Sequence, residues 1–211
     1  MFRLLFLIAL LQFHQPVFST EDTVSQAVAR YLTRIHKYME DEDWINAKRE
    51  LEVTARRYFK NEDSYERALI NQLYGQFYAL QRDYKNAIPW FEKAIAKGRL
   101  PFAADLQVSY SLAQCYFQTG RYKDVIATLE NYRDKASKRG QNMAPIQLML
   151  LGIAYYQEQD TLNAYLNIAE ANATATKLNE EWLQYEFALA VKLEKYDDAV
   201  RVGQFLIFVN P

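Results

Sequence analysis

The sequence predicts an all-α protein, an α-solenoid of about five helical hairpins. Three observations predict this fold class. The 211 residues include only 6 glycines and 5 prolines, whereas helix-favouring Ala, Leu, Gln, Glu and Lys are frequent. Half of the residues are apolar and 15% are aromatic, which indicates a folded chain. Finally, a pattern of small and aromatic residues returns about every forty positions.

The repeat is clearest in LYGQFYALQRDYKNAIPWFEKA, where Gly75 is followed three residues later by Tyr78. A second set follows it at helical spacing: Tyr84, Ala87, Phe91 and Ala94. The frame returns as Ala113, Tyr116, Gly120, Tyr122, Val125 and Leu129, and again as Gly152, Tyr155, Ala164, Ile168 and Ala171. Weaker copies contain Tyr38, Trp44, Ala47 and Leu51 on one side and Phe187, Tyr196 and Ala199 on the other.

Each copy predicts two helices, because a small residue lets them approach and the aromatic three positions later shares its helical face. One hairpin cannot bury its apolar face alone, so successive hairpins must stack. Asp83 and Asp160 are predicted N-caps of second helices, and Pro101 and Pro145 stand where first helices begin. Pro89 lies inside a predicted second helix and should bend it.

Aligning the copies on Ala47, Ala87, Val125, Ala164 and Ala199 gives steps of 40, 38, 39 and 35 residues. The predicted units therefore span residues 28–63, 64–101, 102–141, 142–178 and 179–211 of a single domain, residues 20–211. These offsets are those of the tetratricopeptide repeat, whose basic unit is about 34 residues, with the excess in the connections.

The first nineteen residues have the layout of a secretory signal peptide. Arg3 precedes the apolar run from Leu4 to Leu11, and Val17 and Ser19 are small residues placed for cleavage. The run is short for a bilayer span. We therefore expect export of residues 20–211 to the periplasm. Two alternatives stay open: an uncleaved segment anchoring the chain in the inner membrane, or a buried first helix.

The composition offers little chemistry. The net charge of −1 argues against nucleic acid as a partner. After removal of residues 1–19 the chain would keep one histidine, His36, and one cysteine, Cys115, so neither a metal centre nor a nucleophile–base pair is predicted. Cys115, between Leu112 and Tyr116, is expected to be buried. We expect no cofactor, no catalytic residue and no enzyme activity.

Two acidic stretches need a separate interpretation. Glu40–Asp43 and Glu180–Glu181 are expected to be solvated turns between helices. A carboxylate pair at Glu180 and Glu181 would be the starting point for the competing hypothesis, an enzyme that acts on cell-wall glycan.

In such solenoids the first helices line a concave groove. Carrying the frame over predicts a partner-binding lining of amide and aromatic side chains that suits an extended peptide or a helix of another protein. Its members are Gln72, Gln76, Tyr110, Gln114, Phe117, Gln118, Met149, Tyr156, Gln157 and Gln184. Equally, Tyr110, Phe117 and Tyr156 could simply pack between neighbouring hairpins. Some tetratricopeptide domains bind the C-terminal carboxylate of a partner with a set of Lys, Asn and Arg side chains. These positions lack that set, so a ligand of this class is not expected.

The distal half, roughly Tyr65 to Pro211, resembles a narrower family. The motifs SYSLAQCYFQTGRYKDVIATLENY, QLMLLGIAYYQEQD and EEWLQYEFALAVKLEKYDDAV are similar to periplasmic tetratricopeptide proteins of Gram-negative bacteria that accompany TonB energy-transduction systems. The resemblance implies a non-enzymatic scaffold, peripheral to the membrane at most, that serves TonB-dependent uptake of iron carriers. An adaptor for outer-membrane or peptidoglycan assembly enzymes is the alternative function.

Overall fold

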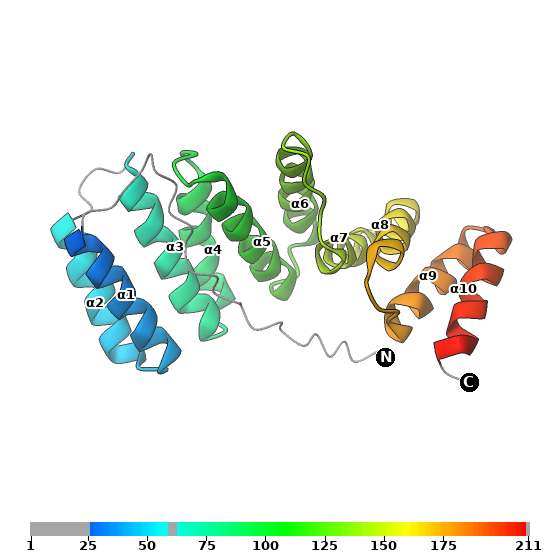
Figure 1. Ribbon diagram of the computed structural model, residues 1–211, viewed down its shortest axis with the longest axis horizontal. Coiled ribbons are helices and arrows are strands. Elements are labelled where there is room, and N and C mark those ends of the chain that lie inside the picture. Colours follow the sequence, from blue (N-terminus) through cyan, green and yellow to red (C-terminus); the bar gives the residue numbers. More distant parts are fainter. Residues whose placement is uncertain (1–25, 59–62, 210–211) are drawn as a thin grey trace.

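A computed structural model describes residues 26–58 and 63–209 (Figure 1). These residues form ten helices and no strand. Their bounds are α1 Gln26–Glu40, α2 Trp44–Tyr58, α3 Tyr65–Leu80, α4 Tyr84–Ile95, α5 Phe102–Gln118, α6 Tyr122–Ser137, α7 Pro145–Gln157, α8 Thr161–Thr174, α9 Glu180–Lys192 and α10 Tyr196–Val209. The predicted signal peptide, residues 1–19, lies outside the described residues.

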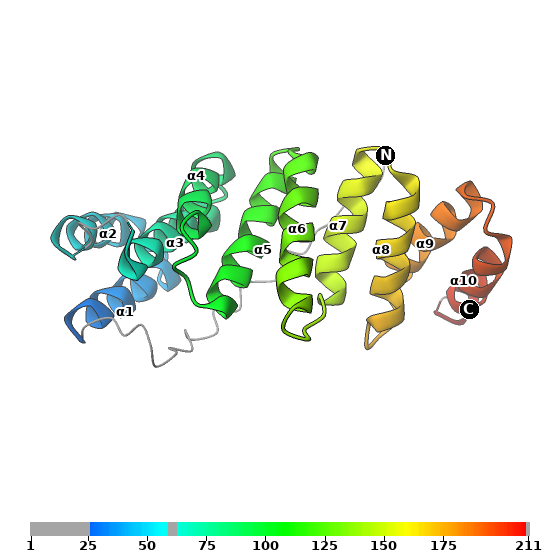
Figure 2. The same cartoon turned by 90° about the horizontal axis from the view of Figure 1, so that it is seen from above.

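The helices follow one another as five hairpins in a curved row, from α1 at one end to α10 at the other (Figures 1 and 2). Extensive contacts join helices that are consecutive in the chain, and α5 also touches α7, the first helix of the next hairpin. Stacked neighbours, rather than a closed bundle, therefore build the core. This confirms the predicted all-α solenoid.

All five hairpin turns use the same backbone device. The aligned residues Ala47, Ala87, Val125, Ala164 and Ala199 each follow, five positions later, a residue with a positive φ. These residues are Glu42, Arg82, Gly120, Gln159 and Glu194, with φ between 55° and 73°. Only the third turn has glycine, which adopts this conformation without strain. A side chain there costs roughly 1–2 kcal/mol, so packing and capping must hold the other four turns in place.

Capping by an aspartate follows the turn in three hairpins. Asp83 accepts a hydrogen bond from the backbone N–H of Asn86 at 3.4 Å, and Asp160 accepts one from Asn163 at 3.1 Å. Both predicted N-caps are confirmed. Asp43 does the same with Asn46 at 3.1 Å, a role that the acidic run Glu40–Asp43 concealed. In each case the asparagine amide also donates to the second carboxylate oxygen, which explains the recurring Asp-x-x-Asn.

Inside the hairpins, a small residue on one helix faces a large one on the other. A Cβ added to Gly75 would lie 2.5 Å from the ring of Phe91, and one added to Gly152 would lie 2.6 Å from Ile168. In the last hairpin the sizes are exchanged, because Gly203 of α10 lies against Phe187 of α9. A small residue thus faces a large one at this contact in both arrangements.

Between hairpins, a tyrosine of a first helix donates to a glutamate of the preceding second helix. Tyr116 Oη lies 2.6 Å from Glu92 Oε1, and Tyr155 Oη lies 3.0 Å from Glu130 Oε1. Alanines, Ala169 and Ala190, hold both places at the next junction. That junction instead uses a different network: Tyr165 Oη donates to Asp198 at 2.7 Å, while Asn172 and Arg201 each donate to Glu186 at 2.9 Å.

Candidate functional site

The predicted groove residues all lie on first helices, but they differ in exposure. Gln118, Tyr156, Gln157 and Gln184 are exposed, and Gln72, Tyr110, Gln114 and Phe117 are half-buried. Tyr156 carries a cation near its ring, since Lys192 Nζ of α9 lies 5.8 Å from the ring centroid. The accessible part of the lining therefore runs from α3 to α9.

Two predicted members are buried, and for these the expectation of a partner-facing side chain is not met. Met149 is only 1% exposed and belongs to the main hydrophobic core, and Gln76 is also buried. We attribute the burial of Met149 to the direct contact between α5 and α7, because a first helix that approaches its neighbour covers the side chain between them. The spacing of residues within one helix does not predict how closely the next first helix approaches it.

The aromatic members fit the two interpretations left open by the sequence, contact with a partner and packing between neighbouring hairpins, only in part. Tyr110 is beside Tyr132 of α6 and shares a hydrogen bond with Gln114, and burial raises the pKa of its phenol to about 12. The ring of Phe117 meets that of Tyr122 edge-on, with centroids 5.5 Å apart. Both therefore pack within their hairpin. Tyr156 remains exposed and is the aromatic available to a partner.

Buried amide groups on α3 add a feature that the sequence analysis missed. The side-chain oxygens of Asn71, Gln72 and Gln76, and the hydroxyl of Ser109 on α5, accept no hydrogen bond from any described residue. A buried acceptor without a donor costs roughly 1–3 kcal/mol. The sequence feature that could have predicted these buried acceptors is the presence of polar residues within otherwise apolar helices. These atoms lie inside the stack and are closed to solvent, so they belong to its interior and not to a surface that a partner can reach.

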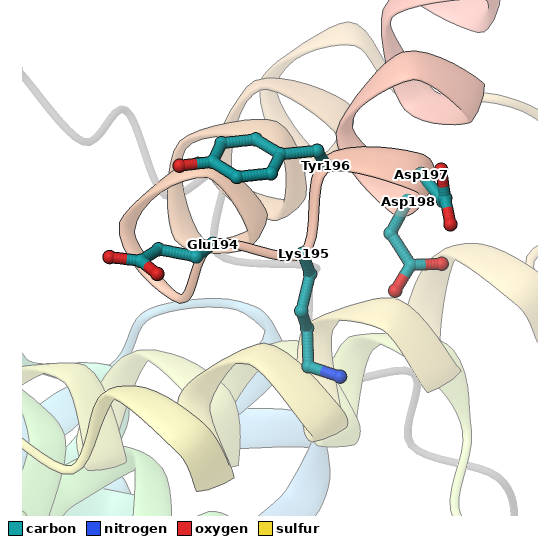
Figure 3. Close-up of a pocket in the computed structure, with 5 residues that line it drawn as sticks. All are labelled: Glu194, Lys195, Tyr196, Asp197 and Asp198. Carbon is teal, nitrogen blue, oxygen red and sulfur yellow. The ribbon is translucent and has the colours of Figure 1, made fainter.

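The turn between α9 and α10 contains an open depression of about 360 Å³, lined by Glu194, Lys195, Tyr196, Asp197 and Asp198 (Figure 3). Lys195 points away from the Tyr196 ring toward the preceding hairpin (Figure 3), and its Nζ lies 5.3 Å from the ring centroid of Tyr165. The hydrogen bond from Tyr165 is the main cause that lowers the pKa of Asp198. Lys195 and Asp198 contact Tyr165 of α8, so the residues around the depression connect the hairpins α7–α8 and α9–α10.

The cysteine, the histidine and the acidic pair considered in the sequence analysis lie in surroundings that explain them by folding and helix stability. Cys115 is buried as predicted, and burial raises its thiol pKa to about 12, which suppresses the reactive thiolate. Burial also lowers the pKa of His36. Glu180 and Glu181 lie in the first turn of α9, where negative charge stabilises a helix.

Residues 26–58 and 63–209 contain no group of three His, Cys, Asp or Glu side chains that could hold a metal ion. Within the same residues, no helix combines the length and the apolar character required to cross a membrane.

Comparison with known proteins places the fold. A family model described as anaphase-promoting complex, cyclosome, subunit 3 matches residues 80–142. No curated protein sequence matches the chain. Among solved structures, MamA from Desulfovibrio magneticus RS-1 aligns with a TM-score of 0.67 at 16% identity, covering 88% of this chain and 96% of that one.

Two further structures are similar at comparable identity. A tetratricopeptide repeat protein from Parabacteroides merdae ATCC 43184 aligns with a TM-score of 0.64 at 15% identity, over 87% of this chain and 66% of its own. PilW, a type IV pilus biogenesis factor, aligns with a TM-score of 0.53 at 17% identity, over 87% and 93%. The chain thus has the tetratricopeptide-type fold.

Proposed function

We propose that this chain is a periplasmic adaptor that holds a segment of another protein along its first helices, as an accessory of a TonB-dependent uptake system. The observation that carries the binding role is the line of accessible amides and one exposed tyrosine, Tyr156, from α3 to α9. Amides donate and accept, so they can pair with the backbone of an extended segment.

The chemistry of the lining sets the kind of binding. Gln72, Gln114, Gln118, Gln157 and Gln184 are uncharged, so recognition depends on hydrogen bonds and aromatic contact. Such binding depends weakly on ionic strength, because salt screens interactions between charges. Weak salt dependence distinguishes this surface from one that recognises a charged tail.

Periplasmic location and the TonB partner rest on sequence features. The signal-like layout of residues 1–19 supports export, and the motifs from Tyr65 onward support a TonB-associated role. An adaptor for envelope assembly is the second candidate. The similarity to PilW, whose fold aligns over 93% of its length, favours that candidate.

Affinity capture from Gram-negative envelope extracts tests the proposal. The bait is the chain as exported, and the variant combines Gln114→Ala, Tyr156→Ala and Gln157→Ala. Asn131→Ala, on the exposed side of second helix α6, is the matched control. We expect recovery of TonB-system components by the wild-type and control baits, and at least a tenfold loss with the triple variant. Recovery of assembly enzymes instead favours the second candidate, and equal recovery by all baits contradicts the groove.

A further inference from the structure

Helix α10 exposes an unusual amount of apolar surface for a helix in a stacked array. Phe208 is 78% exposed, Ile207 72%, Tyr196 63% and Val200 62%. Phe205 is partly exposed beside them. Figures 1 and 2 show α10 at the end of the row, with no described helix on its outer side.

Part of this surface is the stripe by which second helices meet the next hairpin. Positions on each second helix are counted from its aligned residue, which is Ala164 in α8 and Ala199 in α10. In the interior of the row, the side chains one, five and eight positions later face the following hairpin. Tyr165, at the first of these positions in α8, bonds to Asp198, and Asn172, at the last, bonds to Glu186. The middle position holds Glu92 in α4, which bonds to Tyr116. In α10 these positions are Val200, Gln204 and Ile207, all exposed.

The surface is wider than that stripe. Phe205 and Phe208 occupy positions six and nine, which are exposed in all four preceding second helices. Position six there holds Val53, Lys93, Asn131 and Glu170, and position nine holds Arg56, Ala96, Asp134 and Ala173. A further hairpin stacked as in the interior would cover the stripe and leave both phenylalanines in water. The occupant must therefore reach beyond the interior stacking geometry.

We propose that a second copy of this chain covers this face, with the two α10 helices packed antiparallel about a two-fold axis near Gln204. A two-fold interface joins one patch to itself and so needs a self-complementary surface. The α10 face meets this need: Val200, Gln204, Phe205, Ile207 and Phe208 carry no charge. Gln204, at the axis, can exchange hydrogen bonds with the same residue of the other copy.

The neighbouring charges do not oppose this pairing. Arg201, the cation within this segment, is held on its own hairpin by Glu186 at 2.9 Å and Asp198 at 3.6 Å. An antiparallel arrangement with its axis at Gln204 sets Val200 of one copy against Phe208 of the other. Val200 and Phe208 therefore form an apolar pair on both sides of the axis, whereas Ile207 lies opposite Arg201, whose guanidinium stays on its own hairpin.

The size of the face sets the strength of the association. Two phenylalanines, a tyrosine and two aliphatic side chains at these exposures offer on the order of 500 Å² per copy. Stable specific interfaces bury about 800 Å² per partner. We therefore expect a reversible dimer with a dissociation constant in the micromolar range or weaker.

Analytical ultracentrifugation of the full chain, with the N-terminus it carries in the cell, tests the proposal from about 1 to 200 µM. The test variant combines Ile207→Lys and Phe208→Lys. The matched control is Ile45→Lys on α2, at the opposite end of the row, whose side chain is 83% exposed. We expect wild-type and control chains to double in mass with rising concentration, and the test variant to associate at least tenfold more weakly.

Circular dichroism of each variant establishes that a loss of association is not a loss of fold, and Gln204→Lys supplies a second, single-residue test. A wild-type chain that stays monomeric throughout the range overturns the proposal. So does equal weakening by Ile45→Lys. Flotation with phosphatidylcholine or phosphatidylglycerol vesicles that is lost in the test variant would reassign the face to a membrane surface, and also overturns it.

Discussion

The central hairpin α7–α8 and the terminal hairpin α9–α10 solve the same packing problem with opposite residues. In the centre, Gly152 on the first helix receives Ile168 from the second. At the end, the first helix supplies Phe187 and the second supplies Gly203. The fit is also looser there, since a Cβ on Gly203 would be 3.5 Å from Phe187. A small residue therefore faces a large one in both hairpins, and either helix of the pair can provide the small residue.

The two hairpins also differ in their surroundings. Helix α7 is buried almost all round, from Leu148 to Ala154, because it has neighbours on both sides of the row. Among the described residues, helix α10 has neighbours on one side of the row only, namely α9 and, through Tyr165, α8, and it exposes five large apolar side chains. The outer face of α10 is therefore apolar, whereas a repeat that ends an array ordinarily has a polar outer face.

The largest expected effect breaks the tight contact of the central hairpin. Gly152→Ala would place a Cβ 2.6 Å from Ile168 and 3.2 Å from the backbone oxygen of Ala164. Because backbone cannot move aside as a flexible side chain can, we expect a loss of about 3 kcal/mol, the upper end for overpacking. Urea denaturation followed by circular dichroism measures it. An unchanged midpoint would show that the hairpin is less constrained than its geometry indicates.

A smaller loss is expected from Arg201→Met in the terminal hairpin. Glu186 is 1% exposed and would lose its cation, keeping only the amide of Asn172. Removing one partner of a fully buried pair costs roughly 3–5 kcal/mol, but Arg201 is 51% exposed, so we expect about 2 kcal/mol. The double variant with Glu186→Gln should recover part of the loss in the same denaturation assay. No recovery would mean that the Arg201 stem, and not its charge, stabilises the junction.

Tyr155→Phe tests the junction before the central hairpin. Loss of the bond to Glu130 should cost about 1 kcal/mol at neutral pH. Burial raises the pKa of the Tyr155 phenol from 10.0 to about 12. The folded state therefore favours the neutral phenol, and this contribution is complete below pH 10 and is lost toward pH 12. Denaturation at pH 7 and pH 11 should show a shallower alkaline decline in the variant; parallel declines would contradict the assignment.

The smallest effect has the opposite sign. Gly203→Ala adds a Cβ at ordinary contact distance from Phe187 and removes a glycine from a helix interior. We expect stabilisation by roughly 0.5–1 kcal/mol. Measured beside Gly152→Ala, the same chemical change should destabilise one hairpin and stabilise the other. Destabilisation at both positions would remove the distinction between the two hairpins.

Much of the fold was predictable because it depends on the spacing of small and aromatic residues that are close together in the chain. The aligned residues Ala47, Ala87, Val125, Ala164 and Ala199 are all buried, and each lies on the second helix of a pair. The exchange of Phe187 and Gly203 was not predictable from a residue-by-residue alignment, since each position departs from the pattern when viewed alone. Only the pair conserves the contact.

The candidate site was predictable in part. Helical offsets placed Gln118, Tyr156, Gln157 and Gln184 on accessible surface, but they also selected Met149, which is buried. An offset describes one helix, whereas burial depends on how closely the next first helix approaches. The binding role of this surface stays a prediction until a partner is tested.

The sequence by itself determined the helices, their turns and their order of stacking, because small and aromatic residues, aspartate caps and periodicity act within a hairpin or between adjacent ones. Tertiary structure alone decided which polar groups are left buried without donors, which aromatics turn inward, and that α10 presents an uncovered apolar face. These properties depend on distances between elements that are remote in the chain, and local spacing contains no information about such distances.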